Sequence, residues 1–103
     1  MTTWFVSRHP GALDWIKSKG LQVDKWIKHL DTSLIEPGDT VIGTLSMEAA
    51  ATVCRKGARF IAIELNLSES MRGKELTSDT LNQIHCKLTE FYVSRVGNPF
   101  TRD

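Results

Sequence analysis

Cysteine is scarce in this chain, and Cys54 and Cys86 stand far apart in the sequence. They form no close-spaced pair of the kind that binds zinc or exchanges disulfides, and two cysteines do not make a disulfide framework. We expect both thiols to be reduced and partly buried. The carboxylates are scattered too, without the spacing of a metal pair. The sequence therefore predicts a protein that uses neither a metal ion nor a cofactor.

Net charge and long apolar runs are also lacking. The 13 lysines and arginines nearly balance the 12 acidic residues, which leaves a net charge of +1. Such a balance gives no reason to expect broad binding to duplex nucleic acid or acidic membranes. No apolar run approaches the roughly 18–20 residues that span a bilayer, and the first residues lack a signal-peptide profile. We expect a soluble, cytoplasmic protein that holds any phosphate ligand locally.

The length of the chain indicates its domain organisation. A chain of 103 residues has room for one domain, whose core is adequate without metal or disulfide staples. We place this domain at residues 1–95 and regard residues 96–103 as a loose C-terminal tail.

Strand and helix patterns alternate along the chain. Branched and aromatic residues favour the strands, while helical spacing and capping residues favour the helices. The expected strands cover residues 4–6, 21–30, 40–45 and 58–67, and the expected helices cover 10–20, 46–57 and 77–91. This order predicts an α/β fold of three layers with a mostly parallel central sheet of about four strands.

Polarity and spacing give further detail within the expected helices. We expect Asp14 in the first turn of the first helix, where a negative charge complements the helix dipole. The buried face of the second helix is expected at Met47, Ala50, Ala51 and Cys54. The buried stripe of the last helix is expected at Leu81, Ile84, Leu88 and Phe91.

The second expected strand and its connection to the third are ambiguous. Residues 21–30 also place apolar side chains on one helical face, but their position between two units favours a strand. The following residues 31–38 contain no helix, although parallel neighbours need a crossover of roughly a dozen residues or more. Either the second and third strands are antiparallel, or residues 31–38 run back extended across an edge.

The turn from Ser7 to Gly11 follows the first strand and leads into a helix. His9 suits the capping position, and Pro10 suits the first helical position because its fixed φ is already helical. Unpaired N–H groups at a helix N-terminus stabilise an anion, by roughly 0.3–1 kcal/mol at an exposed site. This turn therefore predicts a phosphate site that Arg8 and His9 can touch.

A second loop, formed by Gly43, Thr44, Leu45 and Ser46, also follows a strand and leads into a helix. Ligands of open α/β sheets gather at the carboxyl ends of the strands. If the first and third strands run the same way, the two loops lie on one edge and clamp one phosphodiester. Neither loop has a complete dinucleotide-binding glycine fingerprint or a Walker lysine pattern.

Each candidate side chain has a structural alternative. His9 is the best candidate for proton transfer but is equally suited to be a helix cap. Arg8 either holds a phosphate through its planar fork or lies on the surface. Arg72 and Lys74 either close over an anion as a lid or belong to an exposed loop. His29 and Asp31 share a face if they lie on a strand, but we expect them to be merely solvated.

Four segments together resemble a small accessory protein of type III CRISPR systems: WFVSRHPGAL at 4–13, HLD at 29–31, PGDTVIGTL at 37–45 and RGKEL at 72–76. The resemblance implies a relative of the Rossmann-like (CARF-like) sensor domains, which bind cyclic oligoadenylate, the messenger made when these systems detect foreign RNA. It further implies a ring nuclease that linearises the messenger, with cyclic tetra-adenylate as the expected ring, and so switches off the nucleases that the messenger activates.

With that function in view, we assign roles to the two loops. Arg8 and the amides near Pro10 and Gly11 hold the phosphate, His9 acts as general acid or base, and Ser7 and Thr44 orient the reacting groups. A ring with rotational symmetry also suits a homodimer. Two alternatives remain: a binding protein that senses or sequesters the messenger without cleaving it, and a structural accessory subunit with no nucleotide site.

Overall fold

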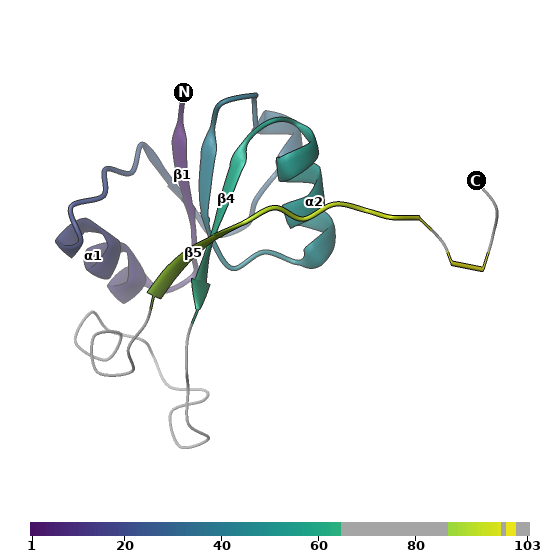
Figure 1. Cartoon of the computed structure of the whole chain (residues 1–103). Helices are drawn as coiled ribbons and strands as arrows, with labels where there is room; N and C mark the ends of the chain where they lie inside the picture. The colour runs from purple at the N-terminus through teal and green to yellow at the C-terminus, as the bar shows by residue number, and fades with distance from the viewer. Residues whose placement is uncertain (65–86, 98, 101–103) are drawn as a thin grey trace, which may run out of the picture.

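The computed structural model describes residues 1–64, 87–97 and 99–100 and has an α/β architecture (Figure 1). Its elements are β1 (Thr3–Val6), α1 (Pro10–Ser18), β2 (Lys25–Ile27), the 3-10 helix η1 (Thr32–Leu34), β3 (Thr40–Gly43), α2 (Met47–Arg55), β4 (Arg59–Glu64) and β5 (Lys87–Phe91). The strands form a five-stranded sheet in the order β2-β1-β3-β4-β5. Only β5 is antiparallel to its neighbour, so the prediction of a mostly parallel sheet is confirmed.

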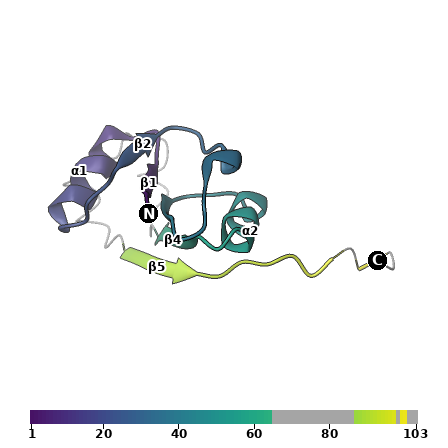
Figure 2. The ribbon, with the colours of Figure 1, turned by 90° about the horizontal axis from the view of Figure 1, so that it is seen from above.

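The two faces of the sheet carry separate hydrophobic clusters, because successive side chains of a strand point to opposite faces. On one face the buried side chains of β1 and β3 pack against α1: Phe5, Ile42, Ala12, Trp15 and Ile16. On the other face they pack against α2: Trp4, Val6, Val41, Ala50, Val53 and Cys54. Figure 2 shows α1 and α2 on opposite sides of the sheet. The Rossmann-like classification that the resemblance implies stays a prediction.

The connection between β2 and β3 differs from both expected alternatives. Both strands are parallel to β1, which lies between them, so they are not neighbours at all. The connecting residues 28–39 include η1, and Ile35 at its end is buried in the same cluster as α2. Asp31 caps η1, and its carboxylate accepts hydrogen bonds from the backbone N–H (3.0 Å) and the hydroxyl (2.6 Å) of Ser33. A short 3-10 helix with one buried anchor therefore replaces a crossover helix.

The prediction of a helix that reaches Phe91 is wrong for residues 87–91, which form β5 against β4. Leu88 consequently packs against the cluster on the α1 face, and Phe91 is 43% exposed. Two ion pairs link the strands, Lys87 to Glu64 (3.2 Å) and Arg59 to Glu90 (2.6 Å). The added strand raises the count from the expected four to five. The rest of the expected helix, residues 77–86, lies outside the described residues.

The two described helices begin largely as predicted. Pro10 is the first residue of α1, and the Ser46 hydroxyl accepts the Ala49 N–H (3.1 Å) at the start of α2. Two details are wrong: Asp14, the fifth residue of α1, lies beyond the first turn, and Met47 is 81% exposed. Met47 is the first residue of α2, one turn before Ala50, the first buried residue of the helix.

The segment after β5 crosses α2 before it leaves the body of the protein (Figure 1). The Val93 N–H donates to the buried Cys54 sulfur (3.4 Å), and the Arg95 guanidinium donates to the Glu48 carbonyl (3.2 Å). Cys54 is a free, buried thiol, as expected, whereas Cys86 lies outside the described residues. Val96, the first residue of the predicted tail, is fully exposed.

A buried carboxylate joins β1 to the turn that precedes β3. Asp39 is 4% exposed and accepts hydrogen bonds from the Thr2 N–H (2.9 Å), the Glu36 N–H (3.0 Å) and the Trp4 indole N–H (3.2 Å). The Thr2 N–H above all, helped by the other two donors, holds the pKa of Asp39 below its usual value of 3.8. The ionised form is therefore the one that stabilises the fold.

We expect Asp39→Asn to lower the free energy of unfolding by about 1–3 kcal/mol at neutral pH, because one buried N–H donor would then face an amide NH₂. Since folding lowers the pKa of Asp39, its stabilisation is present above about pH 4 and is lost as the pH falls through the folded pKa. The difference between the natural protein and the variant is thus expected to shrink in acid. Urea unfolding at neutral pH and at about pH 3 measures both effects.

Asp14→Asn provides the matched control, since Asp14 is exposed on α1. We expect this control to change the free energy of unfolding by less than about 0.5 kcal/mol. Equal losses in the two variants, or a loss in Asp39→Asn that does not change with pH, would contradict the role of the Asp39 carboxylate.

Candidate functional site

Three of the four parallel strands, β2, β1 and β3, end in register at one edge of the sheet. Val6, the last residue of β1, pairs with Ile27 of β2 on one side and with Gly43 of β3 on the other. The loops that follow β1 and β3 therefore lie at the same edge, as the sequence predicted on the condition that these strands run the same way. The end of β2 adds a third segment to this edge, which the sequence analysis did not include.

A cavity of about 420 Å³ opens where these three strands end and α2 begins. Its lining residues come from three segments of the chain: Val6, Arg8, Lys28, His29, Leu30, Thr44, Leu45, Ser46 and Ala49. Two of these residues are cationic, one is an imidazole and two carry hydroxyls, whereas the described residues that line the cavity include no carboxylate. We call it the strand-end cavity. Its composition suits an anion, and phosphate in particular.

The predicted site residues that the structure describes divide into two groups. Arg8, Thr44, Leu45 and Ser46 all line the strand-end cavity, and Gly43 ends the strand that leads into it. Ser7, His9, Pro10 and Gly11 are not among its lining residues and form the turn and first helical residues beside it. Arg72 and Lys74 lie outside the described residues. Arg8, and not His9, is therefore the residue of the first predicted loop that lines a cavity together with the second loop.

The turn between β1 and α1 is held by its own hydrogen bonds. The Ser7 hydroxyl accepts the His9 N–H (3.1 Å), and the Ser7 N–H donates to the Ile27 carbonyl (3.0 Å). His9 occupies the capping position of α1, but its side chain makes no capping hydrogen bond. The prediction that His9 takes the capping position of α1 is thus confirmed, although the imidazole makes no capping bond, and the Ser7 hydroxyl has a structural partner of its own.

Lys28 and His29 were not predicted as site residues, yet both line the strand-end cavity. His29 is exposed, as expected, while the Asp31 carboxylate caps η1 and accepts hydrogen bonds from Ser33. The hydrogen bonds from Ser33 hold the pKa of Asp31 below its usual value. The signal that could have found Lys28 and His29 is their place directly after β2, since ligands collect beyond the carboxyl ends of parallel strands.

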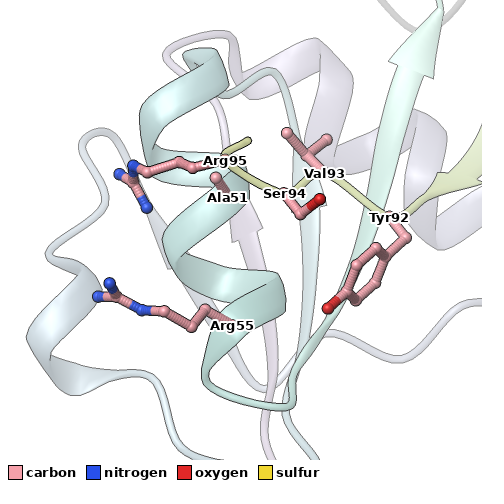
Figure 3. Close-up of a pocket in the computed structure, with 6 residues that line it drawn as sticks. All are labelled: Ala51, Arg55, Tyr92, Val93, Ser94 and Arg95. Carbon is pink, nitrogen blue, oxygen red and sulfur yellow. The ribbon is translucent and has the colours of Figure 1, made fainter. Parts of the chain in front are cut away.

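A second cavity, of about 270 Å³, lies between α2 and the segment after β5 (Figure 3). It is lined by Ala51, Arg55, Tyr92, Val93, Ser94 and Arg95. Figure 3 shows the Arg55 and Arg95 side chains extending to one side of α2 and the Tyr92 ring lying on the other. Arg95 is also held by hydrogen bonds to α2. These polar groups do not converge on one point, so the strand-end cavity is the better candidate site.

Two other kinds of site are absent from the described part of the chain. No group of three or more histidine, cysteine, aspartate or glutamate side chains there could hold a metal ion. No helix within the same residues is both long and apolar enough to cross a membrane.

Comparison with known proteins places the chain in a family. A family model described as "Putative CRISPR-associated protein (Cas_VVA1548)" matches residues 4–94, from β1 to the segment after β5. The chain belongs to this family. No curated protein matches it, and no solved structure does. The CRISPR association that the resemblance implied is thus confirmed, and its finer content, the type III system and the ring nuclease activity, stays a prediction.

Gly43 shapes the site of this CRISPR-associated protein by letting β1 and β3 end close together. Its φ is +152°, and an added Cβ would collide with the carbonyl oxygen of Val6 and lie 3.1 Å from the Val6 Cβ. Only glycine adopts such a backbone conformation readily. A side chain at this position would push apart the two strand ends that carry Arg8 and Thr44.

We expect Gly43→Ala to lower the free energy of unfolding by about 1–3 kcal/mol, because it adds backbone strain and a collision with Val6. Gly20→Ala is the matched control: Gly20 also has a positive φ, +79°, but an added Cβ there has no neighbour within 4 Å. The control is expected to lose only about 1 kcal/mol, from backbone strain alone. Denaturant unfolding of the two variants compares them, and a loss for Gly43→Ala no greater than for Gly20→Ala would contradict the close approach.

Proposed function

We propose that this CRISPR-associated protein is a ring nuclease that binds cyclic oligoadenylate, with cyclic tetra-adenylate as the substrate, and linearises it. The observation that carries the proposal is the strand-end cavity, which is lined by Arg8, Lys28, His29 and two hydroxyl side chains and by no carboxylate of the described residues. The resemblance of the sequence to the ring nuclease group supplies the identity of the phosphodiester. Linearisation of the messenger would switch off type III CRISPR signalling.

In this proposal the cavity binds the phosphate that will be cleaved. The Arg8 guanidinium offers two parallel donors to its oxygens, and Lys28 adds a second positive charge. Thr44 and Ser46 contribute hydroxyls close to the N-terminus of α2, whose partial positive charge also favours an anion. Local charge of this kind binds a phosphodiester even though the net charge of the chain is only +1.

The proposed reaction uses the nucleophile that the substrate carries. The ribose 2′-oxygen loses its proton and attacks the adjacent phosphorus, the bond from phosphorus to the 5′-oxygen breaks, and the departing oxygen takes up a proton. The products are a 2′,3′-cyclic phosphate and a free 5′-hydroxyl, and no metal is required. Positioning the 2′-oxygen in line with the leaving oxygen can contribute several kcal/mol. Arg8 would stabilise the extra negative charge on phosphorus.

Two histidines are candidates for the proton transfers. His9 is the residue that the sequence favours, and it directly follows Arg8. His29 is the one that lines the strand-end cavity. General acid or base catalysis contributes about 10²–10⁴-fold to a rate, so loss of the true catalyst is easily measured.

The deciding experiment incubates the protein with cyclic tetra-adenylate in a chelator and separates the products. We expect linear oligoadenylate that ends in a 2′,3′-cyclic phosphate. If the substrate is bound tightly but stays intact, the alternative of a protein that sequesters the messenger is correct. Absence of binding would contradict both proposals and favour a structural accessory subunit.

Arg8→Gln is expected to weaken binding by roughly 10–150-fold, because it removes a hydrogen-bonded charge worth about 1.5–3 kcal/mol. Lys17→Gln is the matched control, since it removes a positive charge from the last turn of α1, at the far end from Arg8. Equilibrium titration of both variants measures the difference. Equal affinities would rule out Arg8 as the phosphate ligand.

His9→Ala and His29→Ala separate the two candidates for proton transfer. The substitution that removes the catalyst is expected to slow single-turnover cleavage by about 10²–10⁴-fold and to leave affinity nearly unchanged. We expect His29→Ala to have this effect if the reacting linkage lies in the strand-end cavity, and His9→Ala if it lies over the turn. Normal cleavage by both variants would rule out histidine catalysis.

The same messenger suits a homodimer, because a ring with rotational symmetry presents equivalent linkages to the sites of two equivalent subunits. Light scattering in solution measures the number of subunits. A monomer in both the free and the ligand-bound protein would contradict this part of the proposal.

A further inference from the structure

Trp26 differs from the other two tryptophans of the chain in its exposure. Trp4 and Trp15 are 5% and 2% exposed and belong to the two hydrophobic clusters. Trp26 is 38% exposed, although its large ring would gain more from burial than most side chains. An indole held at the surface is well suited to contact a ligand.

Trp26 does not line the strand-end cavity, but a hydrogen bond ties its indole to the turn that carries Arg8 into that cavity. Its indole N–H donates to the Ser7 carbonyl (2.9 Å), which belongs to the peptide group that leads into Arg8. The backbone pairs Trp26 with Phe5 of β1, and two residues after Trp26 the chain supplies Lys28 to the cavity. The indole is therefore tied to the turn that carries Arg8, and its own strand leads into Lys28, the other cationic residue of the cavity.

The hydrogen bond also determines which part of Trp26 is left for a ligand. Because the indole has one polar hydrogen and Ser7 accepts it, what the side chain has left to offer a ligand is its apolar ring. Nucleobases stack on such aromatic rings, with a contribution of about 1–3 kcal/mol per base. A base and its phosphate are joined through one ribose, so a phosphate bound at Arg8 brings a base within reach of a ring anchored at Ser7.

From this placement we infer that Trp26 is a nucleobase-stacking platform, which binds a base of the nucleotide whose phosphate lies in the strand-end cavity. The site would then select nucleotides over base-free phosphates. The identity of that base as adenine rests on the proposed function, but the stacking itself does not.

Iodide quenching of tryptophan emission tests the inference without a substitution. Trp26 is the exposed tryptophan, so an ionic quencher acts mainly on it, and a stacked base is expected to shield it. Saturating cyclic tetra-adenylate should therefore reduce the quenching by iodide. Unchanged quenching at saturation would overturn the inference, since a ring covered by a base cannot stay equally accessible.

Substitutions measure the contribution of stacking. Trp26→Leu is expected to weaken binding of cyclic tetra-adenylate by about 5–150-fold, and Trp26→Phe, which keeps an aromatic ring, by less. Tyr92→Leu is the control, because Tyr92 is 77% exposed but lines the cavity beside α2 instead. If Trp26→Leu binds as tightly as Tyr92→Leu, the inference is wrong.

A further comparison distinguishes failure of the inference from failure of the proposed function. If the natural protein does not bind cyclic tetra-adenylate, the proposed function fails, and ATP and inorganic pyrophosphate become the probes. Stacking then predicts that ATP binds more tightly than pyrophosphate and that Trp26→Leu removes most of this preference. Equal affinities of the natural protein for ATP and pyrophosphate would overturn the stacking role in that case as well.

Discussion

The alignment of β1 with β3 is the constraint on which the rest of the structure depends. The buried carboxylate of Asp39 holds the N–H of Thr2 and the indole of Trp4, while the Thr40 N–H donates to the Thr2 carbonyl (2.9 Å). These bonds fix the start of both strands, and the register that follows places Val6 opposite Gly43 at their ends. A carboxylate at one edge of the sheet thus determines the geometry of the cavity at the other.

The strand-end cavity shows how a nearly neutral chain can offer a cationic site. Arg8 and Lys28 are contributed by the ends of two neighbouring strands, and Thr44 and Ser46 follow a third. Parallel pairing brings these ends together, although they are separated by tens of residues in the sequence. Because Gly43 has no side chain, β1 and β3 can approach closely at this point. Charge is concentrated by topology and not by composition.

Much of the fold followed from local patterns, and the errors have specific physical causes. Residues 87–91 carry helical spacing at Leu88 and Phe91, but pairing with β4 and the ion pairs of Lys87 and Glu90 favour a strand. Neither expected path between β2 and β3 was right, because both assumed that consecutive strands are neighbours in the sheet, whereas β1 lies between these two. Met47 fitted the apolar period of α2 but lies at its exposed first residue. The apolar period of a short segment does not show which distant strand it pairs with or where the core ends.

The sequence by itself determined the α/β class, the start of α1 at Pro10, the cap of α2 at Ser46 and the two loops after β1 and β3, because these depend on residues near one another in the chain. The family was also determined by sequence. Only the tertiary structure decided that β2 lies beside β1, and hence that Lys28 and His29 join Arg8 in one cavity while Trp26 is anchored to Ser7. Strand order depends on which distant apolar faces pack together, and that choice is made by the whole core rather than by any one segment.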